Sequence, residues 1–85
     1  MAAAVETRIA PQGELCADTI DGLRAALGEA ARSGASVVVD LAEVTLLSAA
    51  AIGVLVQIEG VRLLNPTPLS RAVLAAVGLE DLIRD

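Results

Sequence analysis

The residues best placed to do chemistry lie around Ser48, where an apolar segment ends and a helix is expected to begin. A helix start presents free backbone N–H groups and the positive end of the helix dipole, and both favour an anion such as phosphate. The Ser48 hydroxyl is therefore a candidate phosphoacceptor, and Thr45 is a weaker one. The favoured interpretation of each is structural: Ser48 caps the helix, a contribution of about 1 kcal/mol, and Thr45 ends a strand.

Two further side chains carry groups that can react or bind. Asp40 follows an apolar strand and can bind a cation or a partner arginine, although a carboxylate that stabilises the next turn is favoured. Cys16 is the only cysteine. We interpret it as a small apolar residue, because redox chemistry needs a second thiol or a neighbouring base.

The residue types that are absent from the chain exclude several functions. The 85 residues include no histidine, no lysine and no aromatic side chain. Serine–histidine and cysteine–histidine pairs, imidazole metal ligands and Schiff-base lysines are therefore impossible within the chain. We expect no enzyme, no metal site and no cofactor. With a net charge of −5 and arginine as the only cation, nucleic acid is a poor partner.

The same composition gives an expectation for localisation. The uncharged stretch 44–58 is shorter than the roughly 18–20 apolar residues that a membrane span needs. A basic region followed by an apolar stretch, as in a signal peptide, is not visible at the N-terminus. We expect a cytoplasmic protein that does not insert directly into a membrane.

The elements that must position these residues alternate between strand and helix. Asp18 is expected to cap the first helix and Thr67 the third, with Pro68 at its first position. This order predicts an α/β fold in which helices pack against a small single-layer sheet with mainly parallel central strands. Residues 1–85 form a single domain, with a frayed alanine-rich start. The expected segments are a strand at 5–10 broken by 11–13, a helix at 19–32, a strand at 37–41, a turn at 42–43, a stretch at 44–47 that leads away from the sheet, a helix at 49–58, a strand at 61–64, a helix from 68 that Gly78 stops, and a last helical turn at 79–83 over the sheet edge.

Three stretches with matching order and spacing resemble the STAS domain, the fold of bacterial anti-sigma factor antagonists. They correspond to the opening motif, the central signature and the closing strand and helix of that family. The matching residues are Gly13-Glu14-Leu15 with Thr19 and Leu23-Arg24; Val38-Val39-Asp40-Leu41 with Val44-Thr45 and Ile52-Gly53-Val54-Leu55; and Gly60-Val61-Arg62-Leu63-Leu64 with Pro68, Arg71, Val73, Leu74 and Gly78-Leu79.

The chain departs from the family pattern at the phosphorylation motif. Aligned without gaps, Ser48 falls on the family's aspartate and Ala49 on its phosphorylatable serine, and Ala50 and Ala51 replace the two small residues that follow. Cys16 stands where the opening motif has aspartate. The segment 48–60 is also shorter by roughly seven residues, about two helical turns, and the usual first strand of the N-terminal hairpin is expected to be missing.

The resemblance implies a regulatory binding domain rather than an enzyme. Such a domain binds an anti-sigma factor that is an ATP-dependent serine kinase, and phosphate on the serine breaks the contact. Ala49 cannot accept phosphate, so constitutive binding is expected. The expected partner-binding residues are Asp40, Thr45, Ser48, Ala49, Ala50, Ala51 and Gly53.

Three alternatives remain open at this stage. A STAS accessory subunit that docks on a membrane-transporter ATPase, such as an ABC lipid-transport complex, would use the same edge. A small hydrolase or phosphotransfer enzyme would use Ser48 as its nucleophile, and the lack of histidine and lysine argues against it. A degenerate domain without a partner is suggested by the short second helix.

Overall fold

The computed structural model describes residues 6–16, 18–34 and 36–84. Its elements in chain order are β1 (Glu6–Ile9), β2 (Gly13–Leu15), α1 (Ile20–Arg32), β3 (Ser36–Asp40), β4 (Val44–Leu47), α2 (Ala49–Leu55), β5 (Arg62–Leu64), α3 (Pro68–Ala76) and the 3-10 helix η1 (Glu80–Leu82). The alanine-rich start, expected to be frayed, lies outside the described residues.

The strands form two small parallel sheets, so the predicted α/β class with parallel central strands is confirmed. The larger sheet has the order β1-β3-β5, and the smaller one pairs β2 with β4. The predicted break at 11–13 is where the chain passes from one sheet to the other. Gly13 adopts a φ of 77° there, and its N–H donates to the carbonyl of Glu43 at 2.9 Å.

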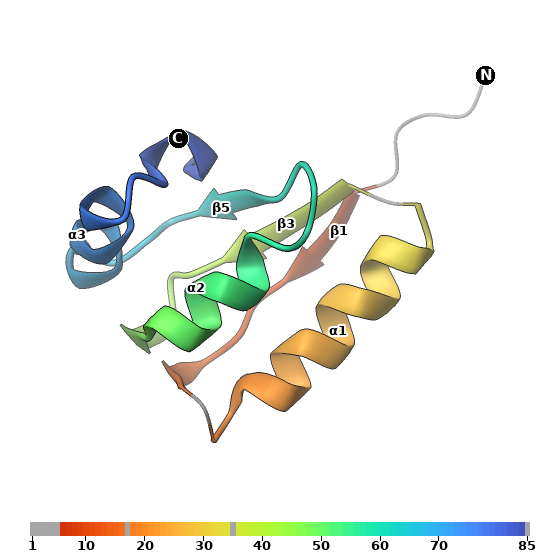
Figure 1. The fold of residues 1–85 in the computed structure, drawn as a ribbon, viewed down its shortest axis with the longest axis horizontal. Helices are drawn as coiled ribbons and strands as arrows, with labels where there is room; N and C mark the ends of the chain where they lie inside the picture. Colours follow the sequence, from red (N-terminus) through yellow and green to blue (C-terminus); the bar gives the residue numbers. More distant parts are fainter. Residues whose placement is uncertain (1–5, 17, 35, 85) are drawn as a thin grey trace.

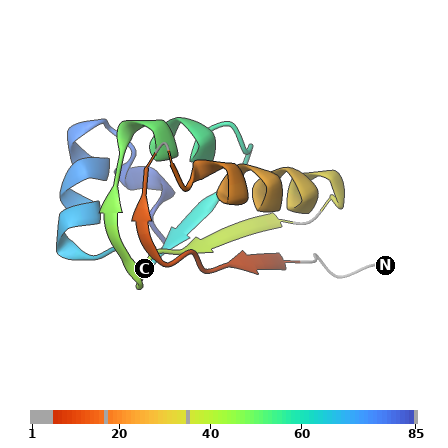
Figure 2. The same ribbon diagram turned by 90° about the horizontal axis from the view of Figure 1, so that it is seen from below.

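Helices α1 and α2 cover one face of the larger sheet, and no helix of the described residues lies on the opposite face (Figures 1 and 2). Strand alternation explains this division, because side chains of successive residues point to opposite faces. Val37, Val39 and Leu41 belong to the core cluster beneath the helices, together with Leu27 of α1 and Leu55 of α2. The core is therefore built from aliphatic side chains alone, as the composition requires.

Local signals explain where the helices begin and end. Thr67 caps α3 with its hydroxyl, which accepts from the N–H of Ser70 at 3.2 Å, and Pro68 is the first helical residue, as predicted. The prediction that Asp18 caps α1 was wrong, because Thr19 stands at that position. The Thr19 hydroxyl donates to the carbonyl of Glu14 at 2.7 Å and accepts from the Cys16 N–H at 3.0 Å, which ties the helix start to β2.

The end of the second helix differs from the predicted boundary, whereas the stretches before and after it behave as predicted. Helix α2 ends at Leu55, three residues earlier than expected, and the chain turns through 56–60, where Gly60 has a φ of 76°. The stretch 44–47, expected to lead away from the main sheet, does so as a strand of its own. Beyond η1, Ile83 forms an isolated parallel bridge with Leu63, so the chain covers that side of β5 as expected. Among the described residues, no helix has the length and apolar character to cross a membrane.

Candidate functional site

Ser48 lies at the junction between β4 and α2, where the backbones of β2 and β4 hold it in position. The Ser48 N–H donates to the carbonyl of Leu15 in β2 at 3.0 Å, so the pairing of β2 with β4 sets where α2 begins. The backbone of Ser48 is extended, with φ −84° and ψ 164°, which is the conformation that an N-cap requires. The start of the helix is therefore fixed by the smaller sheet.

The Ser48 hydroxyl acts as a helix cap. Its oxygen accepts from the backbone N–H of Ala51 at 3.2 Å, and the residue is half-buried. A serine cap contributes about 1 kcal/mol to helix stability. The interpretation of Ser48 as a helix cap therefore has a direct geometric basis. The helix that it caps is seven residues long.

The solvent side of α2 is small, apolar and uncharged. Ala49, Ala50, Gly53 and Val56 are exposed and share one side of the helix, since they follow at intervals of one, three and three residues. We call this surface, with Ser48 at its start, the α2 edge. No charged residue occurs in the sequence between Glu43 and Glu59. A surface of this kind can receive another protein closely, because no charge has to be desolvated.

Two exposed large apolar residues, one in the α2 edge and one in β4, were missed by the sequence analysis. Val56 is 45% exposed beside Gly53, and Leu46 is 42% exposed in β4, next to the exposed Thr45. In β4 the residues Thr45 and Leu46 are both exposed, which breaks the alternation that a half-buried strand normally shows. The length of the uncharged run 44–58 was the signal that could have identified them.

Ala51 does not belong to the exposed surface, although the sequence analysis grouped it with the partner-binding residues. Its side chain has no exposed area and lies in the core cluster. Because it faces the sheet, Ala51 lets α2 pack closely against the strands and cannot contact a partner in this conformation. This correction follows from helix geometry, since residues 49, 50 and 53 share a side that residue 51 does not.

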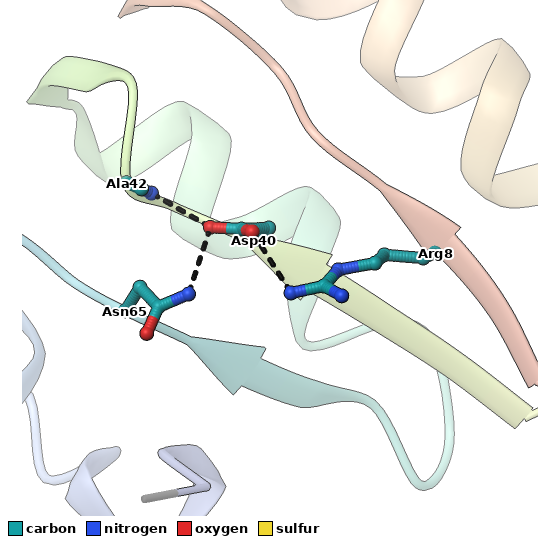
Figure 3. A network of polar contacts seen from close by, with 4 residues as sticks. All are labelled: Arg8, Asp40, Ala42 and Asn65. Atoms are coloured by element: carbon teal, nitrogen blue, oxygen red, sulfur yellow. Dashed lines mark hydrogen bonds and ion pairs between the residues drawn. The ribbon is translucent and has the colours of Figure 1, made fainter.

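Asp40 lies on the open face of the larger sheet and is not brought together with the α2 edge. Figure 3 shows its carboxylate joined to three segments. One oxygen accepts from the Ala42 N–H at 3.0 Å and the Asn65 side-chain amide at 3.4 Å, and the other accepts from the Arg8 guanidinium at 3.0 Å. The hydrogen bond from the Ala42 backbone is the main cause that lowers the pKa of Asp40 below its ordinary value. The contacts with Asn65 and Arg8 lower it further, while partial burial acts in the opposite direction.

The structure also shows how the acidic side chains and Cys16 are placed. No group of three or more acidic or cysteine side chains is placed to hold a metal ion there. Cys16 is half-buried beside Thr19, whose hydroxyl lies 3.9 Å from its sulfur. Among the described residues, the exposed and uncharged α2 edge is therefore the candidate site.

Comparison with known proteins places the chain in a family. The model described as "Mlab, STAS domain" matches residues 2–84. A comparison with curated proteins found no match.

Two solved structures share the fold. The unphosphorylated anti-sigma factor antagonist SpoIIAA aligns with a TM-score of 0.80 and 21% identity, over 100% of this chain and 83% of that one. The phosphorylated form of SpoIIAA, described as a Bacillus cell fate determinant, aligns with a TM-score of 0.72 and 22% identity, over 100% and 86% of the two chains. These likenesses confirm the predicted fold.

Proposed function

Because the chain belongs to the STAS domain family, we propose that it is a non-enzymatic regulatory domain, spanning residues 1–85, that binds a protein partner through the α2 edge. The observation that carries the proposal is the exposed, uncharged surface of Ala49, Ala50, Gly53 and Val56. Close packing against small residues forms well-fitted contacts, and the absence of charge avoids a desolvation cost.

The partner that we propose is a bacterial anti-sigma factor with ATP-dependent serine kinase activity. SpoIIAA, whose fold this chain shares, is by name an antagonist of an anti-sigma factor. In this role the chain acts in the cytoplasm and regulates transcription by occupying the anti-sigma factor.

Binding is proposed to be constitutive rather than switched by phosphate. Ala49, at the position that the family resemblance assigns to the phosphoacceptor, has no hydroxyl. The nearest hydroxyl belongs to Ser48, and it already accepts from the Ala51 N–H. A phosphate on Ser48 would have to disrupt this cap and would add a charge of about −1.5 to −2 to an uncharged surface.

A second candidate is favoured by this lack of a phosphoacceptor. A permanent accessory subunit of a membrane-transporter ATPase needs a docking surface but no switch, so an alanine at residue 49 suits it at least equally well. The two candidates use the same edge and differ in the identity of the partner.

Capture of the partner with tagged variants tests both candidates. The native chain, Ala50→Arg and Ala31→Arg are used as bait with and without ATP, and the recovered proteins are identified by mass spectrometry. Ala31 is an exposed alanine at the far end of α1, so the control adds the same side chain to the same kind of element. We expect Ala50→Arg to lose the partner and Ala31→Arg to retain it.

The outcomes separate the candidates clearly. Recovery of an anti-sigma kinase supports the first, and recovery of a transporter ATPase in its place refutes the first and supports the second. Equal recovery with both variants contradicts the role of the α2 edge. Stoichiometric radiolabel on Ser48 or Thr45, after incubation with the partner kinase and labelled ATP, contradicts constitutive binding.

A further inference from the structure

The open face of the larger sheet gathers half of the chain's cations. Arg8 on β1 and Arg62 on β5 are both register partners of Val38 in the central strand, so all three side chains point to the same face. Figure 2 shows that the helices lie on the other side of these strands. Arg84, which follows the bridge between Ile83 and Leu63, joins them by contacting Glu6 of β1. Three of the six arginines therefore converge on a surface that no helix covers.

The residue between the two strand arginines is buried. Val38 is only 1% exposed, although it lies outside the core cluster beneath the helices. Arginine stems can cover an apolar neighbour of this kind while their charged ends reach solvent.

The three arginines differ in their partners. Arg8 pairs with Asp40 and Arg84 with Glu6, each at 3.0 Å. Within the described part of the chain Arg62 has no carboxylate partner, and its guanidinium donates only to the carbonyl of Val61 at 3.3 Å. The five charged groups sum to +1 on a chain whose net charge is −5. Among these five groups, Arg62 is therefore the one cation that is not paired with a carboxylate.

A hollow of about 390 Å³ lies directly beside Arg62. Its lining also includes Arg84, Ser36, Val37, Val38, Gly60 and Glu6. The lining thus combines guanidinium and hydroxyl donors with two valines. A carboxylate of a ligand matches the fork of one guanidinium.

We propose that this arginine face binds an acidic, carboxylate-bearing peptide segment of a partner protein, with Arg62 as its anchor. The surface is separate from the α2 edge and is independent of the function proposed for that edge. Because the molecule as a whole repels a polyanion, any binding of an acidic peptide must come from local contacts.

Titration with two model peptides tests the proposal. Hexaglutamate and, as an uncharged control, hexaglutamine are added to the 15N-labelled chain, and amide shifts are followed by NMR. We expect saturable shifts with hexaglutamate in β5 and at the start of β3, which weaken with salt, and none in α2. Hexaglutamine should produce no shifts.

Matched variants distinguish the anchor from a general charge effect. Arg62→Met retains an unbranched stem over Val38 and is expected to weaken hexaglutamate binding at least about tenfold. Arg62→Lys retains the charge but loses the forked guanidinium. Its affinity for hexaglutamate should lie between those of the native chain and Arg62→Met. Arg24→Met removes an exposed arginine of α1 and should change the affinity less than about twofold. Thermal unfolding of each variant verifies that it folds.

Several results would overturn the proposal. They are the absence of saturable binding to the native chain, shifts centred on α2, and equal losses for Arg62→Met and Arg24→Met. Inorganic phosphate that binds at Arg62 where hexaglutamate does not would show that the hollow takes a small anion instead of a peptide.

Discussion

Asp40 connects the ends of two neighbouring strands and the turn that follows the first of them. The hydrogen bond from the Ala42 backbone closes the turn after β3 and is the main cause of the lowered pKa of Asp40. Asn65, just past β5, contributes a side-chain amide from a left-handed backbone with φ 51°, a conformation that asparagine tolerates better than most residues. The interpretation of Asp40 as a turn-stabilising carboxylate accounts for the Ala42 contact, whereas its role in partner binding stays a prediction.

The lowered pKa of Asp40 gives a pH dependence with a definite sign. Because the folded state favours the carboxylate, the stabilisation is complete above the ordinary aspartate pKa of about 3.9 and is lost as the pH falls toward the lower folded value. We expect the native chain to lose stability relative to Asp40→Asn below about pH 4. Urea unfolding of both proteins between pH 2.5 and 7 measures this difference, and a constant difference across that range would contradict it.

The residues that cap the helices were predicted correctly at α2 and α3 but not at α1. Ser48 and Thr67 cap α2 and α3 as expected, because each directly precedes a helix. At α1 the sequence offers Asp18 and Thr19 side by side. The carbonyl of Glu14, which the Thr19 hydroxyl contacts, is brought close only by the fold.

At the scale of elements, the exposed Gly53 is unusual in the middle of α2. A methyl group at this residue would meet no heavy atom within 4 Å, so nothing inside the molecule requires glycine. Gly53→Ala should stabilise the fold by about 0.5–1 kcal/mol. If a partner packs closely against the α2 edge, the same methyl group should weaken its binding.

Gly28→Ala in α1 is the matched control for Gly53→Ala. Its added methyl group is equally free of contacts, so the gain in stability should be similar and the affinity should not change. Thermal unfolding and binding to the captured partner are measured for both variants. Unchanged affinity in Gly53→Ala would remove close packing as the explanation for this glycine.

Helices were easier to predict than strands. Apolar residues at helical spacing located α1 and α3 to within a few residues. Strand β2 has only three residues, too few to show a period, and its partner β4 lies about thirty residues further along the chain. The division into two sheets therefore could not be predicted from local patterns, because it depends on which distant segments pair. For the same reason, the sequence did not predict that one face of the larger sheet is left without a helix.

At the scale of the whole molecule, Leu41 joins the two sheets. Its N–H donates to Leu64 of β5 at 2.8 Å, and its carbonyl accepts from Val44 of β4 at 3.1 Å. Its side chain has no exposed area and lies in a core cluster that also includes Leu15 and Leu47 of the smaller sheet. One continuous core predicts cooperative unfolding, which would argue against a degenerate domain.

Leu41→Ala should therefore destabilise both sheets together, by about 2–5 kcal/mol. The control Leu69→Ala removes a side chain that is 53% exposed on α3 and should cost less than about 0.5 kcal/mol. Urea unfolding by circular dichroism gives the free energies. Hydrogen exchange at Val39 and Ser48 compares the two sheets, and a clearly lower protection at Ser48 would reveal independent units.

The aliphatic core also makes the molecule optically silent above 250 nm, because the chain has no tryptophan, tyrosine or phenylalanine. Any near-ultraviolet absorption or intrinsic fluorescence of a complex then belongs to the partner. Leu46, which is 42% exposed beside the start of α2, is a site where one introduced tryptophan would be the only emitter of the chain. The protein can thus report the approach of a partner to this surface without a chemical label.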